Sequence, residues 1–331
     1  MSDAYNTSTV LNKSQDPTMT TEQNTPALST ISDVERETGV AKETLRVWER
    51  RYDFPQPERD QNGERQYPAA QVHRLRLVKR LLDQGYRPGK IMHLDTDALA
   101  ELGAKAGAST PAPDANDPEL RLCLDLIKRH KIAELRQRMA QTLLQLGLLR
   151  FVTELVAPLT TLVGDSWAAG ELAVFEEHLF AEMLQSLMRN AIFSANQQIG
   201  LTAAAPRILL TTVPQERHGL GLLMAEALFA LEGAHCVSLG VQTPLADIVA
   251  AARVQSADIV ALSFSSVLSP RAAIENVTEL QARLGEATQV WAGGSCAALA
   301  RRQLGPQRVL DLHDIRGAVA RWRADHALTA L

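Results

Sequence analysis

The sequence predicts a multidomain chain in which a small all-α unit, a four-helix bundle and an α/β domain with a doubly wound parallel sheet follow one another. Its 331 residues are enough for two or three domains of about 150 residues each. Two stretches of small residues with Gly and Pro interrupt the chain, as linkers do. Beyond the second interruption, short apolar runs alternate with helical periodicity, which is typical of a parallel sheet.

These interruptions set the domain boundaries. Residues 1–29 are rich in Ser, Thr, Asn and Gln, and we expect them to form a disordered tail. Residues 104–118 contain three Pro and are predicted to be a linker, and residues 200–206 form a shorter break. The predicted domains are residues 30–103, 119–199 and 206–331.

Charge is unevenly distributed along the chain. The chain has 34 Lys and Arg against 38 Asp and Glu, but residues 41–90 have a net charge of +5 and residues 91–331 a net charge of −5. A basic segment on an acidic remainder indicates a nucleic-acid-binding unit. A solvent-exposed surface that binds no nucleic acid could carry the same net charge of +5.

Composition excludes a membrane-spanning or disulfide-rich protein. Apolar stretches such as Asp258–Phe264 are far shorter than the roughly 18–20 residues that a membrane span needs. Residues 1–30 lack the apolar core of a secretory signal, and the three Cys are too few and too widely spaced for a disulfide framework or a metal-ligand pattern. We therefore expect a cytoplasmic protein with reduced thiols and no membrane partner.

The first unit has the outline of a helix-turn-helix. Residues 31–38 and 41–52 have apolar side chains at helical spacing, and Gly39 between them can adopt the left-handed conformation that ends a helix. Residues 54–66, rich in Pro, Gly and Asn, are predicted to be a loop or wing, and residues 69–84 a third helix. Two helices joined by a short turn match this motif.

The second of these helices has a basic face. Lys42, Arg46 and Arg50 are four residues apart and share one side, whereas Leu45 and Trp48 lie on another. A basic second helix suits the major groove of DNA, where Arg contacts base edges and phosphates.

The loop that follows adds further candidates for DNA contact. Arg59, Arg65 and Tyr67 could bind the phosphate backbone. The alternative is a solvated helix and loop in which Glu43 and Glu49 balance the positive charge.

The whole run from Ile31-Ser-Asp-Val through Thr44-Leu-Arg-Val-Trp-Glu-Arg-Arg-Tyr52 to Tyr67 resembles the winged helix-turn-helix of the MerR family. The resemblance implies a dimer on a two-fold site in double-stranded DNA. A linker and bundle follow here, where the family usually has a long dimerisation helix, and the Cys pair of the metal sensors is absent from the sequence. The DNA-binding residues implied are Lys42, Thr44, Arg46, Arg50, Arg51, Arg59, Arg65 and Tyr67.

The two remaining units differ in periodicity. The middle one is predicted to be helical over residues 119–147, 149–167 and 172–196, and a split of the second stretch at Pro158 would give four helices of a bundle. In the last one we expect strands over residues 207–213, 235–241, 258–265 and 289–292. Helices are expected over residues 220–231, 245–254, 271–284 and 296–302. Ligands of such sheets bind at the carboxyl ends of the strands.

Glu216 and His218 directly follow the first predicted strand. An imidazole can ligate a metal through one nitrogen while a carboxylate holds the other, and Gly221 would let a ligand approach the backbone closely. A solvent-exposed loop His beside a Glu is common, so this pair alone does not establish a metal site.

Two more loops at the same edge complete a known pattern. The residues of the pattern are Glu216, His218, Gly221, Ser263, Ser265, Gly293 and Gly294. Together they resemble the signature of the cobalamin-binding, Rossmann-like fold. The resemblance implies that His218 ligates the cobalt of cobalamin from below, that Glu216 bonds its other nitrogen, and that the nucleotide tail of the cofactor passes Ser263 and the Gly293-Gly294 pair. Ser265 stands where the family has Leu.

The bundle carries a second motif, in which Trp167 precedes the Glu177-His178 pair by nine intervening residues, with a helix break expected at Gly170. In isolation, the Trp would be a core anchor and the pair a surface feature. With the rest of the chain, the motif resembles the light-sensing regulators of the CarH/LitR type. That resemblance implies that Trp167, Val174, Glu177 and His178 enclose the upper ligand of cobalamin.

One departure from these regulators concerns the residue after the Trp. The best-known members have a His there that can ligate cobalt after illumination, whereas this chain has Ala168. A light state with two His ligands formed by that route is therefore excluded.

The function expected from the resemblance is a cobalamin-dependent, light-responsive DNA-binding transcription repressor. Its oligomer, a dimer or a tetramer, would bind DNA in the dark with adenosylcobalamin, or with methylcobalamin, and release it in light. One alternative is a MerR-like regulator that senses cobalamin or another tetrapyrrole without light chemistry. A second alternative, against which the DNA-binding unit argues, is a corrinoid module for methyl transfer.

Overall fold

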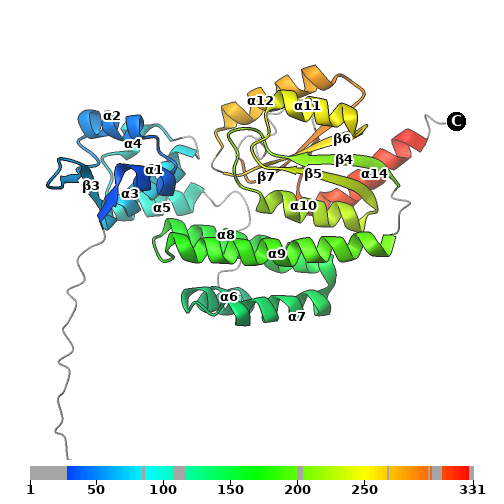
Figure 1. Cartoon of the computed structure of the whole chain (residues 1–331), viewed down its shortest axis with the longest axis horizontal. Coiled ribbons are helices and arrows are strands. Elements are labelled where there is room, and N and C mark those ends of the chain that lie inside the picture. The colour runs from blue at the N-terminus through cyan, green and yellow to red at the C-terminus, as the bar shows by residue number, and fades with distance from the viewer. Residues whose placement is uncertain are drawn as a thin grey trace, which may run out of the picture.

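The computed structural model describes residues 28–83, 86–106, 117–199, 204–266, 268–296, 299 and 308–327. Three parts follow one another in the chain and lie next to one another in space (Figure 1). The N-terminal unit lies beside one end of the helical bundle, and the bundle covers one face of the sheet domain.

The N-terminal unit is a winged helix-turn-helix, as the sequence predicts. Helix α1 (Ile31–Thr38) begins at Thr30, whose side chain accepts a hydrogen bond from the Asp33 N–H, and it ends at Gly39 with φ 70°. Helices α2 (Lys42–Tyr52) and α3 (Ala69–Asp83) lie within one residue of the predicted bounds.

The wing is a small antiparallel sheet rather than a loop. Its strands are β1 (Leu28–Thr30), β2 (Glu58–Arg59) and β3 (Arg65–Pro68), in the order β1-β3-β2. The prediction of a disordered tail was therefore wrong for residues 28 and 29, because they pair with β3. The rest of that predicted tail lies outside the described residues.

Two helices of this unit escaped the sequence analysis. Helix α4 (Pro88–Ile91) has a single turn, too short for periodicity to reveal, and α5 (Thr96–Ala106) runs into the predicted linker. Leu99 of α5 is fully buried in the core of the unit, which explains why the helix forms there. The remainder of the linker up to residue 116 lies outside the described residues.

The bundle begins with two helices where one continuous stretch was expected. Helix α6 (Pro118–Lys128), capped by Asp117, is followed by α7 (Ile132–Arg150). His130, between them, adopts a left-handed φ of 58°, which reverses the chain without a glycine.

Pro158 does not split the next helix. A π-helical segment, η2 (Phe151–Val156), leads directly into α8 (Ala157–Ala168), and Pro158 lies in the first turn of α8. The wider π turn provides the room that a proline ring needs. After a turn at Gly170, α9 (Val174–Ile199) completes the bundle.

The helical stretch Ile132–Ala168 is long and apolar enough to cross a membrane by those two criteria. Bundle helices of soluble proteins meet the same criteria. Here Leu135, Met139, Phe151 and Leu159 from this stretch lie in the core shared with the sheet domain. The stretch is also interrupted at Gly147, whose φ of 74° is not helical, so we interpret it as consecutive helices of the bundle.

The C-terminal domain is a parallel, doubly wound sheet, as predicted. Its strand order is β5-β4-β6-β7-β8. The strands are β4 (Ala204–Thr211), β5 (Ala234–Gly240), β6 (Ile259–Phe264), β7 (Gln289–Gly294) and β8 (Arg308–Leu310). The helices are α10 (Leu220–Leu231), α11 (Leu245–Val254), α12 (Pro270–Leu284), the short η3 (Leu312–Asp314) and α14 (Ile315–Ala327).

The helices cover both faces of the sheet. Helices α11 and α12 lie on one face and α10 and α14 on the other, between the sheet and the bundle (Figure 1). The core of the bundle continues through α10 into the sheet, so that Leu184 of α9 and Ala227 of α10 belong to one cluster with Trp291 of β7. This shared core holds the bundle firmly on the sheet. Most of the helix predicted at 296–302, and the β7–β8 connection after it, lie outside the described residues.

Gly294, where β7 ends, has a φ of 113°, and a Cβ added to it would lie 2.2 Å from the carbonyl oxygen of Phe264. We expect Gly294→Ala to lower the free energy of unfolding by at least about 2 kcal/mol, because it combines a strained backbone with a clash. Urea denaturation of the full chain, followed by circular dichroism, measures this.

The matched control is Gly285→Ala. Gly285 also has a left-handed φ, of 72°, but its added Cβ would have nothing within 4 Å. Gly285→Ala therefore measures the stability lost through backbone strain alone, without a steric clash. Equal losses of stability in both variants would contradict the assigned cause.

Candidate functional site

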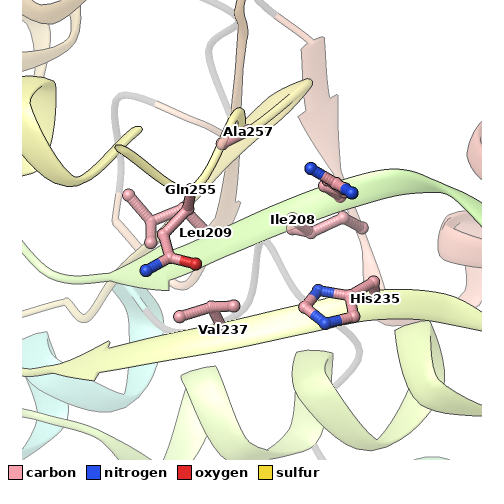
Figure 2. A pocket seen from close by; sticks show the side chains of 7 residues that line it. Ile208, Leu209, His235, Val237, Gln255 and Ala257 are labelled. Atoms are coloured by element: carbon pink, nitrogen blue, oxygen red, sulfur yellow. The ribbon is translucent and has the colours of Figure 1, made fainter. Parts of the chain in front are cut away.

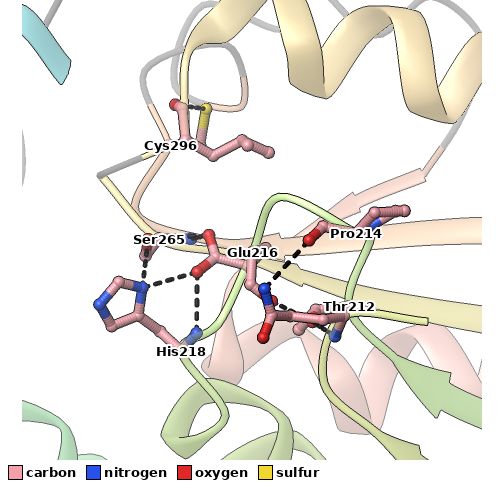
Figure 3. Close-up of polar contacts among 8 residues, drawn as sticks. Thr212, Pro214, Glu216, His218, Ser265 and Cys296 are labelled. Carbon is pink, nitrogen blue, oxygen red and sulfur yellow. Dashed lines mark hydrogen bonds and ion pairs between the residues drawn. The ribbon is translucent and has the colours of Figure 1, made fainter. Parts of the chain in front are cut away.

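The loop between β4 and α10 places a histidine on a buried carboxylate. Glu216 is only 1% exposed, and its Oε1 accepts the His218 backbone N–H at 2.9 Å and lies 2.6 Å from His218 Nδ1. The predicted hydrogen bond between the two side chains is therefore confirmed. Figure 3 shows the second ring nitrogen, Nε2, pointing away from the carboxylate.

Ser265, just after β6, binds the other oxygen of the same carboxylate. Its backbone N–H and its hydroxyl each donate to Glu216 Oε2 at 2.8 Å, and its Oγ lies 3.2 Å from His218 Nδ1 (Figure 3). The sequence analysis counted Ser265 among the cofactor-binding residues, at the position where the family has Leu. The structure instead places it in the hydrogen-bond network of the histidine, because the turn after β6 passes over the β4–α10 loop.

Sequence reasoning missed a threonine that fixes this loop. Thr212 is fully buried, donates its hydroxyl to the Glu216 carbonyl, and accepts the Gln242 N–H at 2.8 Å. The signal was present in the polar Thr211-Thr212 pair at the end of an otherwise apolar strand. These bonds satisfy the loop backbone, so the position of Glu216 is set before any ligand binds.

The glycines of the motif allow close approaches within the protein. A Cβ on Gly221 would lie 2.4 Å from the Ser263 hydroxyl, so this glycine lets α10 pack against the end of β6. Gly293 and Gly294 pair with Ser263 and Phe264 in the parallel register of β6 and β7. The three predicted motif loops thus meet at the carboxyl edge of the sheet.

Burial and hydrogen bonding oppose each other at Glu216. Burial raises the pKa of its carboxyl group, but the hydrogen bonds from His218 and Ser265 outweigh this, and the pKa lies below its ordinary value. The carboxylate is therefore charged at neutral pH. A charged acceptor favours the tautomer in which Nδ1 carries the proton and Nε2 has a free lone pair for a metal.

The bundle supplies a second group of predicted residues at this edge. Trp167 at the end of α8 packs against the shared core, and Val174 and Glu177 at the start of α9 are partly buried. His178 is exposed, with its Nε2 3.7 Å from a carboxylate oxygen of Glu177. Gly170, with φ 75°, ends the turn that separates the two helices, as predicted.

Glu177 connects this group to the histidine loop. Burial raises the pKa of its carboxyl group, and the charges of His178, His218 and Arg217 act in the opposite direction. Charges act over short distances in this way, so the start of α9 faces the β4–α10 loop. Ala168, the residue after Trp167, is buried, with 4% of its surface exposed.

The residues present suit a cobalt corrin. A buried, charged carboxylate orients a half-exposed imidazole whose Nε2 is directed outward, which is the arrangement of a metal-ligating histidine. Glu177, at the start of α9, lies near enough for the charge of His218 to act on its carboxyl group. Within the described residues, no three His, Cys, Asp or Glu side chains gather as a separate metal site.

A depression elsewhere in the sheet domain does not offer a ligand site. It lies along the first halves of β4 and β5, lined by Ile208, Leu209, His235 and Val237 among others (Figure 2). The described residues leave no room there for a water molecule. It is also at the wrong end of the strands for ligand binding.

The predicted DNA-binding face lies on α2 and the wing. Arg50 and Arg51 are exposed, and Leu45 and Trp48 are buried on the opposite side of α2. Arg46 pairs with Glu43 in the same helix, and Lys42 Nζ lies 3.6 Å from Glu35, so both cations have local partners. Thr44 is partly buried at the start of the helix.

The two arginines of the wing, Arg59 and Arg65, have different roles in the structure. Arg59 is exposed and donates to the Gly63 carbonyl at 2.8 Å, which shapes the tip of the wing. Arg65 donates to Glu49 at 2.9 Å and thereby ties the wing to α2. Both remain on the side of the molecule that carries the basic face.

Tyr67 does not contact DNA, contrary to the prediction. Its side chain is fully buried in the core of the N-terminal unit, and its hydroxyl is inaccessible to solvent. Arg65 and Tyr67 share one face of strand β3, but Tyr67 is covered by the core of the unit, whereas Glu49 holds Arg65 nearer the edge of that face. Burial also raises the pKa of its hydroxyl group.

The chain joins two kinds of domain. Residues 29–97 match the model of the MerR HTH family regulatory protein. Residues 120–191 and 206–318 match two models of the B12 binding domain. The protein is therefore a transcriptional regulator of MerR type with cobalamin-binding domains.

Two transcriptional repressors are similar to this chain over most of its length. The chain is 29% identical to the HTH-type transcriptional repressor CarH of Myxococcus xanthus, over 78% of this chain and 86% of that protein. It is 27% identical to the HTH-type transcriptional repressor CarA of the same organism, over 72% and 77%. Both relatives are regulators rather than enzymes. A solved monomethylamine corrinoid protein of Methanosarcina barkeri matches 62% of this chain and 98% of its own, with 17% identity and a TM-score of 0.48.

The lowered pKa of Glu216 predicts a specific dependence of stability on pH. Its charge stabilises the folded chain above the ordinary carboxyl pKa, and this contribution disappears as pH falls through the folded-state value. We expect Glu216→Gln to be less stable than wild type at pH 7, by roughly 1–3 kcal/mol, and the difference to narrow below about pH 4.5.

Urea unfolding midpoints between pH 3 and pH 7 measure this difference. Glu275→Gln, which removes a carboxylate that is 61% exposed and pairs with Arg271 on α12, is the control. A difference between wild type and Glu216→Gln that stays constant across this range would contradict the assignment.

Proposed function

We propose that this protein is a light-responsive repressor that binds adenosylcobalamin between its bundle and its sheet. The observation that carries the proposal is the Glu216–His218–Ser265 network, which orients the His218 ring and leaves its Nε2 directed away from the carboxylate. The charge of His218 also acts on the carboxyl group of Glu177 at the start of α9. Cobalamin, when bound, supplies a cobalt ion with a light-sensitive bond to carbon. The similar proteins CarH and CarA are repressors, which supports the same direction of regulation.

Each group of residues has a distinct part in this proposal. His218 ligates the cobalt, and Glu216 and Ser265 keep its ring oriented and its Nδ1 protonated. Ser263, Gly221 and the Gly293-Gly294 pair would lie along the nucleotide tail at the carboxyl edge of the sheet. Trp167, Val174, Glu177 and His178 enclose the upper ligand, for which the flat Trp ring and the partly buried Glu177 carboxyl suit an adenosyl group better than a methyl group.

Regulation would depend on a difference in binding affinity: cobalamin with its upper ligand would bind more tightly to one assembly of the protein, and cobalamin without it to another. We infer that the cofactor-bound chain is a dimer or tetramer that binds operator DNA in the cytoplasm through α2 and the wing. Loss of the upper ligand would remove the contacts of Trp167 and Glu177, and the oligomer would bind DNA more weakly.

A cobalamin sensor without light chemistry is the second candidate. Ala168 favours it, because this buried position holds no histidine to capture cobalt after illumination. Absorption spectra of the cobalamin-loaded chain before and after illumination separate the two candidates.

We expect the full chain, loaded with adenosylcobalamin in the dark and desalted, to retain a corrin with a base-off/His-on absorption spectrum that changes under green light. His218→Ala should lose the His-on spectrum, because no imidazole remains at that position. His313→Ala, at an exposed position in the short helix η3, is the control. A retained corrin that does not respond to light would favour the second candidate, and no retained corrin would refute both.

Arg50→Ala should weaken binding to a duplex selected from a random library with the wild-type chain. We expect an affinity loss of about 10-fold and a salt-dependence slope shallower by about one, as for a lost phosphate contact. Fluorescence anisotropy at several salt concentrations measures both. Arg271→Ala removes an equally exposed arginine from α12, and a similar loss in that variant would argue against a DNA-binding role for α2.

A further inference from the structure

Helix α3 of the DNA-binding unit docks on the end of α8 that carries Trp167. Three of its side chains, His73, Arg76 and Arg80, are spaced by three and four residues and so share one face. The opposite face, with Leu75 and Val78, is buried in the core of the DNA-binding unit. The polar face is therefore free to contact a second domain.

Arg76 joins the two domains at Trp167 itself. Its guanidinium lies over the indole ring, 5.2 Å from the ring centroid, and it forms a close ion pair with Glu37 of α1. The side chains of Arg76 and Glu37 are only 12% and 18% exposed. A partly desolvated cation over an indole is among the stronger contacts of this kind, so Arg76 restrains the orientation of the ring.

Neighbouring side chains also connect the DNA-binding unit to the rest of the protein. Arg80 pairs with Asp165 of α8 at 2.6 Å. The His73 imidazole approaches Gly170 so closely that an added Cβ would lie 2.5 Å from Nδ1. On the histidine loop, Arg217 reaches the turn of the helix-turn-helix, where its guanidinium lies 3.3 Å from the position of a Cβ on Gly39.

The seam between the two domains is held by these few side chains and is not closely packed. An open cavity of about 500 Å³ runs along it, lined by residues of α1, α3 and the α8–α9 turn. Charged side chains around a cavity make an interface that can open, unlike the shared apolar core that joins the bundle to the sheet.

We propose that Arg76 is a positioning residue for Trp167 and that, through it, the DNA-binding unit responds directly to the cobalamin site. The proposal rests on the proposed function, because it takes Trp167 as a wall of that site. A ligand that fixes or displaces the Trp167 ring changes how α3 docks, and the turn at Gly39 follows through Arg217. The DNA-binding unit therefore changes its docking within one chain, in addition to any change of oligomer.

The test compares the full-length wild type with Arg76→Gln, Arg80→Gln and Trp167→Leu. Arg80→Gln is the matched control, since it removes a guanidinium from the same face of α3 without touching Trp167. Hydrogen exchange of peptides from α1 and α3 is followed with and without adenosylcobalamin in the dark. Cobalamin affinity is measured by absorption, and sedimentation verifies that the variants have the same assembly state.

We expect adenosylcobalamin to change exchange rates in α1 and α3 at least about fivefold in wild type and in Arg80→Gln. The change should be absent in Arg76→Gln and in Trp167→Leu, and the cobalamin Kd of Arg76→Gln should shift by a similar factor. Exchange responses that are the same in all four proteins, or absent from all that bind cobalamin, would overturn the proposal. A wild type that binds no cobalamin would instead refute the proposed function.

Discussion

The buried carboxylate of Glu216 is the interaction on which the candidate site depends. A charged group that is 1% exposed is tolerated only when its oxygens are fully hydrogen-bonded, and here both oxygens accept two bonds each. The donors come from His218 and Ser265, on loops that follow two neighbouring strands. One carboxylate therefore fixes the imidazole and joins the two loops, so the histidine is oriented by the protein alone.

The bundle is as much a part of this site as the sheet. Helix α10 begins in the histidine loop and is covered by apolar residues from the sheet and from α9. Any displacement of the bundle would expose this shared core to water, which is costly. The start of α9 is consequently held opposite His218, and the charges of the histidine loop act on the carboxyl group of Glu177.

The attachment of the DNA-binding unit is physically different. Its own core is apolar and closed, with Leu75 and Tyr67 fully buried, but its contact with the bundle is made by charged and aromatic side chains beside a cavity. Polar contacts of this kind form and break at much lower cost than an apolar core. The chain thus combines a rigid sensor with a DNA-binding unit that is attached through a small number of specific contacts.

The sequence by itself determined the order of the domains, the parallel sheet and the edge at which the motif loops meet. These depend on local periodicity and on turn residues, and the helices at 31–38, 220–231 and 245–254 have the predicted bounds. It also indicated the Glu216–His218 pair, whose members are two residues apart. Short elements such as α4, and the reversal at His130 without a glycine, gave no local signal.

Only the tertiary structure decided which side chains meet across the chain. Tyr67 lies in a core instead of on DNA, because strand β3 turns that face toward α3. Ser265 binds Glu216, 49 residues earlier, because parallel strands bring their carboxyl ends together. Arg76 reaches Trp167 for the same kind of reason: contacts between residues far apart in sequence are set by how whole elements pack, and no periodicity within one element encodes them.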